Sequence, residues 1–205
     1  MKPRLIVVAG PNGSGKTSIT EQFRDLRHKW MVGCEYVNPD DIARERFGDW
    51  NNPAAVLSAA RYASELRERL LAEGKDFAFE TVLSTQDKVD FLKRAKARGY
   101  FVRMFFVGTD HPRINAARIV SRMEDGGHAV PIEKIVSRYA RSIQNALRVA
   151  RFADRAYFYD NSKEIAGGVP AWIPIFRTRC GHIVEKYPRP SDHAWAAEIY
   201  DALEK

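Results

Sequence analysis

The sequence of 205 residues has few of the features that mark extracellular, membrane or disordered proteins. It contains two cysteines, Cys34 and Cys180, which are too few for a disulfide framework and are not spaced as metal ligands. No apolar run approaches the roughly 20 residues that a membrane-spanning helix needs, and the apolar segment 5–9 is too short for the core of a signal peptide. We therefore expect a cytoplasmic globular protein without a membrane partner, whose two thiols are reduced, buried and unreactive.

The charge balance is positive: 33 lysines and arginines stand against 26 aspartates and glutamates, for a net charge of +7. Such an excess favours anionic ligands, among them nucleotides, phosphosugars and nucleic acid. The basic residues are spread along the chain and form no long block. Nucleic acid is therefore the less favoured of these ligands.

Short apolar runs alternate with helical patterns, which is typical of a parallel sheet with crossover helices. Segment 5–9 (LIVVA) is continuous and β-branched, as in a central strand that is buried on both faces. The five predicted strands are 5–9, 35–37, 77–80, 101–107 and 156–159, and the predicted helices are 17–27, 53–73, 86–98, 111–123 and 131–152. After a break at Gly167 and Gly168, the pattern predicts a hairpin over 173–187 and a closing helix. We expect a three-layer α/β fold with a five-stranded parallel sheet over residues 1–165, and an extension of the same domain over residues 166–205.

A phosphate-binding loop follows the first predicted strand and opens the first helix. Residues 10–17 read Gly-Pro-Asn-Gly-Ser-Gly-Lys-Thr, which matches G-x-x-x-x-G-K-[ST] at every fixed position. The glycines let backbone N–H groups turn towards phosphate oxygens, and the helix N-terminus adds its positive dipole. We expect Lys16 to contact the β- and γ-phosphates of ATP and Thr17 to bind Mg²⁺. The residues predicted to bind the nucleotide here are Gly10, Asn12, Gly13, Ser14, Gly15, Lys16, Thr17 and Ser18.

This loop alone does not separate the classes of P-loop protein. The sequence has no N-K-x-D string for guanine, no apolar strand ending in Asp-Glu and no L-S-G-G-Q string. These absences favour a kinase-type P-loop protein that acts on a small molecule. Such a kinase needs a carboxylate near the γ-phosphate to accept the hydroxyl proton, and arginines to stabilise the transferring phosphoryl group.

Two carboxylates end predicted strands at the edge of the sheet where ligands gather. Asp40 is predicted to be the catalytic base, although it or Asp41 could instead cap a helix. Glu80 and Thr81 are predicted to bind substrate hydroxyls, and Glu80 could alternatively support Mg²⁺ or form an ordinary ion pair.

Basic residues on the later helices complete the predicted site. Arg118 and Arg122 share a helical face with Asn115, where an anion would relieve the repulsion between the like charges, or where Asp125 could pair with them on a solvated face. Two glycines follow, so the two helices and their loop are predicted to form a lid over ATP. Arg138 is expected to join the phosphates. His128, in the loop, is either a substrate ligand or a capping or core histidine.

The ordered motifs resemble those of the zeta-toxin-type P-loop kinases, which include UDP-N-acetylglucosamine kinase toxins. The resemblance covers about residues 1–165 and is closest to the short, single-domain branch of that family. It is carried by GPNGSGKTS (10–18), VNPDDI (37–42), FAFETVLST (77–85), the segment 99–107, RIVSRMEDGGHAVP (118–131), Arg138-Tyr139 and YDNS (159–162).

The resemblance implies transfer of the ATP γ-phosphate to a sugar hydroxyl of a nucleotide sugar, with Mg²⁺. It implies that Asp40 is the catalytic base, that Lys16 and Arg122 bind phosphate, and that Glu80 binds the substrate. His128 stands where the toxins have a second phosphate arginine, whose charge Arg118 or Arg138 would then supply. It also implies a small helical antitoxin that covers the nucleotide site.

Two alternatives remain open at this point. The first is a polynucleotide or nucleoside kinase, or an RNA-binding ATPase, which the net charge of +7 favours. The second is a regulatory module that binds a nucleotide without transferring phosphate.

Overall fold

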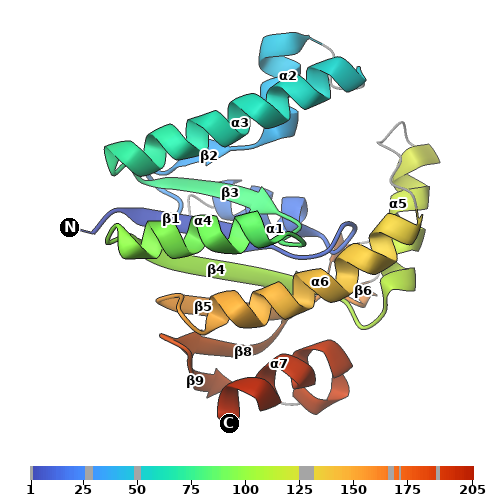
Figure 1. Cartoon of the computed structure of the whole chain (residues 1–205). Coiled ribbons are helices and arrows are strands. Elements are labelled where there is room, and N and C mark those ends of the chain that lie inside the picture. The colour runs from blue at the N-terminus through green and yellow to red at the C-terminus, as the bar shows by residue number, and fades with distance from the viewer. Residues whose placement is uncertain are drawn as a thin grey trace.

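The computed structural model describes residues 2–25, 30–48, 52–124, 132–165, 169–170, 172–187 and 190–205. A single large sheet has the strand order β2-β3-β1-β4-β5-β8-β9 (Figure 1). Its strands are β1 (Arg4–Ala9), β2 (Glu35–Val37), β3 (Phe77–Thr81), β4 (Phe101–Gly108), β5 (Arg155–Asp160), β8 (Ile173–Arg179) and β9 (His182–Lys186). Strands β1 to β5 are parallel, which confirms the five predicted strands, and the predicted hairpin β8–β9 continues the sheet in antiparallel pairing.

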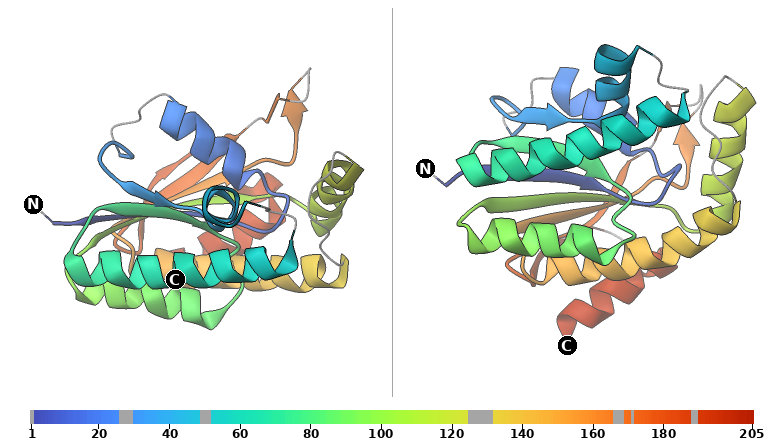
Figure 2. Two further views of the ribbon diagram at one scale, coloured as in Figure 1. Left: turned by 90° about the horizontal axis from the view of Figure 1, so that it is seen from above. Right: turned by 45° about the horizontal axis from the view of Figure 1, so that its top comes forward.

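Helices cover both faces of the sheet. Helix α1 lies on one face, and α3, α4 and α6 lie on the other, as the view from above shows (Figure 2). The helices are α1 (Lys16–Asp25), α2 (Pro39–Phe47), α3 (Pro53–Glu73), α4 (Gln86–Ala97), α5 (Pro112–Glu124), α6 (Ile132–Ala150) and α7 (Ala194–Glu204). Two short elements complete the chain: a two-stranded pair of β6 (Glu164–Ile165) with β7 (Val169–Pro170), and the 3₁₀ turn η1 (Pro190–Asp192).

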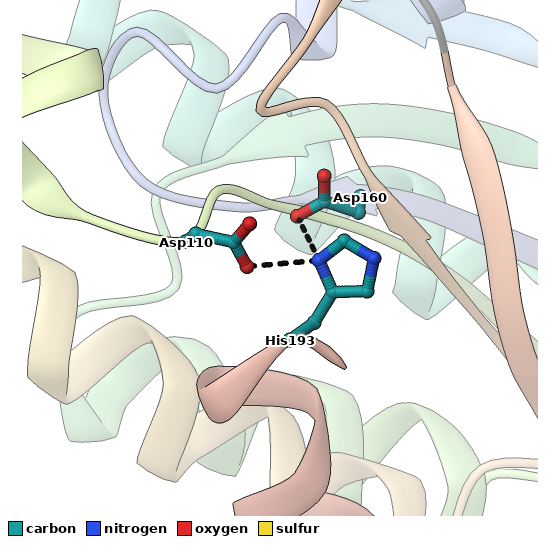
Figure 3. Close-up of side chains that lie close together, drawn as sticks. All are labelled: Asp110, Asp160 and His193. Atoms are coloured by element: carbon teal, nitrogen blue, oxygen red, sulfur yellow. Dashed lines mark hydrogen bonds and ion pairs between the residues drawn. The ribbon is translucent and has the colours of Figure 1, made fainter. Parts of the chain in front are cut away.

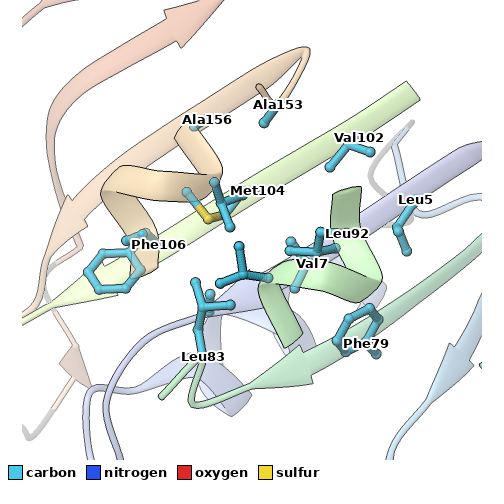
Figure 4. Packing of buried hydrophobic residues seen from close by; sticks show 14 of the residues in the cluster. Leu5, Val7, Phe79, Leu83, Leu92, Val102, Met104, Phe106, Ala153 and Ala156 are labelled. Carbon is cyan, nitrogen blue, oxygen red and sulfur yellow. The ribbon is translucent and has the colours of Figure 1, made fainter. Parts of the chain in front are cut away.

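The central strands are apolar throughout because both of their faces are buried. Leu5 and Val7 of β1 point into the larger core, beneath α4 and α6, together with Phe79, Met104 and Phe106 (Figure 4). Ile6 and Val8 alternate with them and pack with Ile19 of α1 on the opposite face. This alternation anchors β1, and with it the loop that follows, on two sides.

Two local features differ from the sequence-based expectations. Helix α2, from Pro39 to Phe47, begins directly after β2, and its cap is Asn38, whose side chain accepts a hydrogen bond from the N–H of Asp40. The alternative in which Asp40 or Asp41 caps this helix is therefore wrong. The expectation of two buried thiols is also wrong: Cys180 is exposed in the turn between β8 and β9, and Cys34 is half-buried. In the described part of the chain, no helix is both long and apolar enough to cross a bilayer.

The closing helix α7 packs against the end of β4. A Cβ atom added to Gly108 would lie 2.5 Å from two carbons of the Trp195 ring, which is 3% exposed. We therefore expect Gly108→Ala to lower the free energy of unfolding by about 1–3 kcal/mol, the usual cost of overpacking, in a denaturant titration. If the collision is the cause, the same substitution will cost much less in a Trp195→Phe background; an equal cost in both backgrounds would contradict this packing.

Candidate active site

The phosphate loop takes the conformation that its glycines permit. Gly13 and Gly15 have φ angles of +77° and +93°, a region that residues with side chains rarely adopt. A Cβ on Gly13 would lie 2.6 Å from the carbonyl oxygen of Asn115, so the loop also packs tightly against α5. Helix α1 begins at Lys16, so its free N–H groups face the loop.

The two reactive side chains of the loop are held by short contacts. The Lys16 ammonium donates to the Pro11 carbonyl oxygen, 2.9 Å away, and the Thr17 hydroxyl donates to Glu80 Oε2 at 3.1 Å. Glu80 Oε1 accepts a second hydrogen bond, from the Tyr36 hydroxyl at 2.8 Å. Burial and the adjacent Glu80 carboxylate raise the pKa of Tyr36 far above its ordinary value, so its phenol remains a donor. The hydroxyl of Thr17 and the carboxylate of Glu80 are oxygen ligands of the kind that Mg²⁺ prefers.

Two asparagines hold the phosphate loop through its backbone carbonyl groups. The Asn115 amide donates to the Asn12 carbonyl oxygen at 2.8 Å, and the Asn161 amide donates to the Ser14 carbonyl oxygen at 2.9 Å. Because these bonds hold the carbonyl groups of Asn12 and Ser14, they fix the orientation of the loop backbone. From the sequence, YDNS (159–162) contributes to the family resemblance without a role for Asn161, and Asn115 is predicted to share an anion-binding face with Arg118 and Arg122.

A cavity opens beside the phosphate loop, on the side of β2. Asp40 and Thr17 both line a space of about 130 Å³, with Asn38, Asp41 and Arg44 among the other lining residues. This space adjoins a larger one of about 660 Å³, since Arg24, Tyr36, Asn38 and Asp41 line both. A volume of this size is in the range of small-molecule sites. Met31, Cys34 and Ile42 give the larger cavity an apolar part.

The two neighbouring aspartates have different partners. Asp40 is exposed and lines the cavity that Thr17 also lines. Asp41 forms long ion pairs with Arg24, at 3.9 Å, and with Arg44, at 3.7 Å. The guanidinium of Arg24 also lies 4.8 Å from the centre of the Tyr36 ring. Arg24, Tyr36 and Asn38 were not predicted, because their meeting depends on how α1 and β2 pack.

The remaining predicted residues are placed as follows. The Arg118 side chain donates to the Asn161 carbonyl oxygen at 2.8 Å, so it lies close to the phosphate loop. The Thr81 hydroxyl is buried and accepts from the N–H of Leu83 at 3.0 Å, in the turn after β3. Arg138 is half-buried on α6. His128 and the side chain of Arg122 lie outside the described residues, so the predicted lid is described only through α5 and α6.

A second cluster of side chains connects the start of α7 to the edge of the sheet where the site lies. His193 Nδ1 lies 2.8 Å from Asp110 Oδ1 and 3.4 Å from Asp160 Oδ2 (Figure 3). The buried carboxylate of Asp160 also accepts hydrogen bonds from Trp195 Nε1, at 3.0 Å, and from the hydroxyl of Ser162, at 2.9 Å. These contacts lie one residue from Asn161, so they hold the turn that braces the phosphate loop.

The zeta toxin family model matches residues 1–166 of the chain. The chain belongs to the zeta toxin family. The family and the fold are those of the P-loop kinases, as the sequence predicted. An uncharacterized protein of Haemophilus influenzae is 27% identical over 139 residues, which cover 68% of this chain and 94% of that protein.

Solved structures show the same fold at low sequence identity. A chain of the AvrRxo1-ORF1:-ORF2 complex with ATP superposes with a TM-score of 0.69 and 16% identity, over 98% of this chain. This zeta-toxin-family chain spans only 63% of the length of that AvrRxo1 chain. A chain of the PezAT chromosomal toxin–antitoxin system of Streptococcus pneumoniae has a TM-score of 0.60 and 18% identity, over 78% of this chain and 69% of that one.

Proposed function

We propose that the protein transfers the γ-phosphate of ATP, with Mg²⁺, to a hydroxyl group of a small molecule, and that the acceptor is a nucleotide sugar such as UDP-N-acetylglucosamine. One observation carries the proposal. Asp40 and Thr17 line the same cavity, which supports Asp40 as a base beside the phosphate loop. The adjoining space of about 660 Å³ is large enough for an acceptor of the size of a nucleotide sugar.

The chemistry requires few groups. The acceptor oxygen forms a bond to the γ-phosphorus, the bond from that phosphorus to the β–γ bridging oxygen breaks, ADP leaves, and the hydroxyl proton passes to Asp40. Lys16 stabilises the charge that spreads over the transferring phosphoryl group, together with Arg122 and either Arg118 or Arg138 in the resemblance-based assignment. Thr17 and Glu80 would hold Mg²⁺, which neutralises phosphate charge when bound.

The lining of the cavity supports an anionic acceptor with a polar head. Arg24 and Arg44 are both near Asp41, at distances long enough that an incoming pyrophosphate could replace that partner. Tyr36 and Asn38 offer hydrogen bonds to hydroxyl or amide groups. Glu80 contributes indirectly, because it fixes both Thr17 and Tyr36.

The acceptor can be identified by incubating the protein with ATP, Mg²⁺ and a metabolite extract, followed by mass spectrometry for species that gain one phosphate. We expect a phosphorylated nucleotide sugar, and we expect purified UDP-N-acetylglucosamine to be phosphorylated in a separate reaction. Production of ADP with no phosphorylated acceptor would contradict the proposal and favour the regulatory module.

A polynucleotide kinase is the second candidate, favoured by the net charge of +7. RNA and DNA oligonucleotides with free 5′ ends therefore form a further arm of the same assay. Phosphorylation of an oligonucleotide that falls steeply with salt would identify this activity, since phosphate contacts release counterions. A reaction with a nucleotide sugar that hardly depends on salt would exclude it.

The family membership also makes an antitoxin partner part of the proposal. The PezAT structure belongs to a toxin–antitoxin system, and in this chain a small helical protein would cover the nucleotide site. Co-expression with the product of an adjacent gene, followed by a kinase assay of the purified pair, tests this: the pair should be inactive and the released kinase active.

A further inference from the structure

The segment that leads into β8 brings a tryptophan to the phosphate loop. Trp172 comes directly before Ile173, which pairs with Asp160, so Trp172 lies level with Asn161 across the β5–β8 pair. A Cβ added to Gly15 would clash with the side-chain amide of Asn161 and would lie 3.8 Å from Trp172 Nε1. Both side chains therefore flank Gly15. Trp172 also lies beyond the matched family region of residues 1–166.

Each of these two side chains has a polar atom without a hydrogen-bond partner in the described part of the chain. These atoms, Trp172 Nε1 and Asn161 Oδ1, are covered from solvent. Buried indole N–H groups and amide oxygens nearly always have partners in folded proteins. One donor and one acceptor lacking partners beside the same glycine fit a hydroxyl group, which can accept from the first and donate to the second.

The order of the strands tells which part of ATP reaches this place. The phosphate loop follows β1, and the cavity with Asp40 lies on the side of β3 and β2. The γ-phosphate must face that cavity, so the nucleoside end of ATP must point the other way, across β4. Asn161 directly follows β5 and Trp172 directly precedes β8. These strands lie on that opposite side in the sheet order β1-β4-β5-β8.

We propose that Trp172 and Asn161 bind the ribose of ATP, with the indole N–H donating to a ribose hydroxyl that donates in turn to Asn161 Oδ1. Trp172 is half-buried, so part of the residue is accessible from solvent. The inference rests on the proposed function of the phosphate loop, and it extends the nucleotide site into the C-terminal extension.

The test compares nucleotide affinities, without any acceptor, for the wild-type chain and for Trp172→Phe, which keeps an aromatic ring and removes the N–H. Three ligands are used with Mg²⁺: ATP, 2′,3′-dideoxy-ATP and tripolyphosphate. We expect Trp172→Phe to lower the affinity for ATP about fivefold, the effect of one hydrogen bond. The affinities for dideoxy-ATP and tripolyphosphate should be unchanged. The matched control is Trp30→Phe, because Trp30 is also partly buried on the α1 face but contacts Arg103 and Arg4 at the opposite end of the sheet.

A second readout follows the wild-type chain by NMR and uses the variant only to assign one signal. The sequence has four tryptophans, and the indole ¹⁵N–¹H signal that is missing from Trp172→Phe identifies Trp172. We expect ATP, but not dideoxy-ATP or tripolyphosphate, to shift this signal in the wild-type chain.

If Trp172→Phe lowered the affinities for all three ligands equally, Trp172 would shape the phosphate loop. If it lowered the affinities for ATP and dideoxy-ATP equally, Trp172 would contact the base. Either result overturns the inference. An unchanged ATP affinity also overturns it. These outcomes are separate from the proposed function, since a chain that binds ATP as predicted here but phosphorylates no acceptor would retain the ribose contact and lose the kinase assignment.

Discussion

Replacing Lys16 with alanine should reduce phosphate transfer by about 10²–10³-fold or more, the effect of removing one preorganised charge from a developing phosphoryl group. The ammonium lies within the loop, 2.9 Å from the Pro11 carbonyl oxygen, and is therefore close to where the β- and γ-phosphates bind. ATP affinity should fall as well, because the lysine binds the ground state and the transition state. The measurement is release of ADP and of phosphorylated acceptor under saturating ATP.

Lys75→Ala is the matched control. Lys75 is exposed and precedes β3 at the opposite edge of the sheet, so the substitution removes one positive charge without touching the loop. It should leave transfer unchanged. If Lys16→Ala were as active as Lys75→Ala, the phosphate loop would not be the catalytic nucleotide site.

Asp40→Asn should separate nucleotide binding from chemistry. The amide has nearly the shape of the carboxylate but cannot accept the hydroxyl proton, so we expect transfer to fall about 10²–10⁴-fold. The affinity for ATP should stay within about twofold, because Asp40 faces the acceptor cavity and not the loop amides. The two quantities are a single-turnover transfer rate and an equilibrium titration with a nonhydrolysable ATP analogue.

Asp41→Asn distinguishes the base from its neighbour. Asp41 is paired with Arg24 and Arg44, so its loss should change the Michaelis constant of the acceptor more than the rate of transfer. A larger loss of rate for Asp41→Asn than for Asp40→Asn would move the role of base to Asp41.

The strands and the phosphate loop could be predicted from the sequence because their signals are local. Segment 5–9 is apolar at every position, and the eight-residue loop motif specifies its own conformation through glycines at fixed positions. The start of α2 also had a local signal, Asn38 followed by Pro39, which is typical of a helix cap and first turn. Asp40 and Asp41 are equally suitable as caps by residue type, so the sequence alone does not decide between them and Asn38.

The residues that support the site could not be predicted in the same way. Asn161 and Ser14 are 147 positions apart, and Asn115 and Asn12 are 103 positions apart. Their contacts depend on the order and register of the strands, which the apolar pattern does not specify. No local pattern marks Trp172 either, since only the pairing of β5 with β8 places its indole beside Gly15.

The most direct test of the proposed chemistry is a crystal structure with Mg²⁺ and a nonhydrolysable ATP analogue, in which the position of the Asp40 carboxylate relative to the γ-phosphorus is measured. We predict that the carboxylate faces this phosphorus across a gap in which one acceptor oxygen can lie within about 3 Å of both. A carboxylate that points to bulk solvent, with no room for a hydroxyl between it and the γ-phosphorus, would contradict the account.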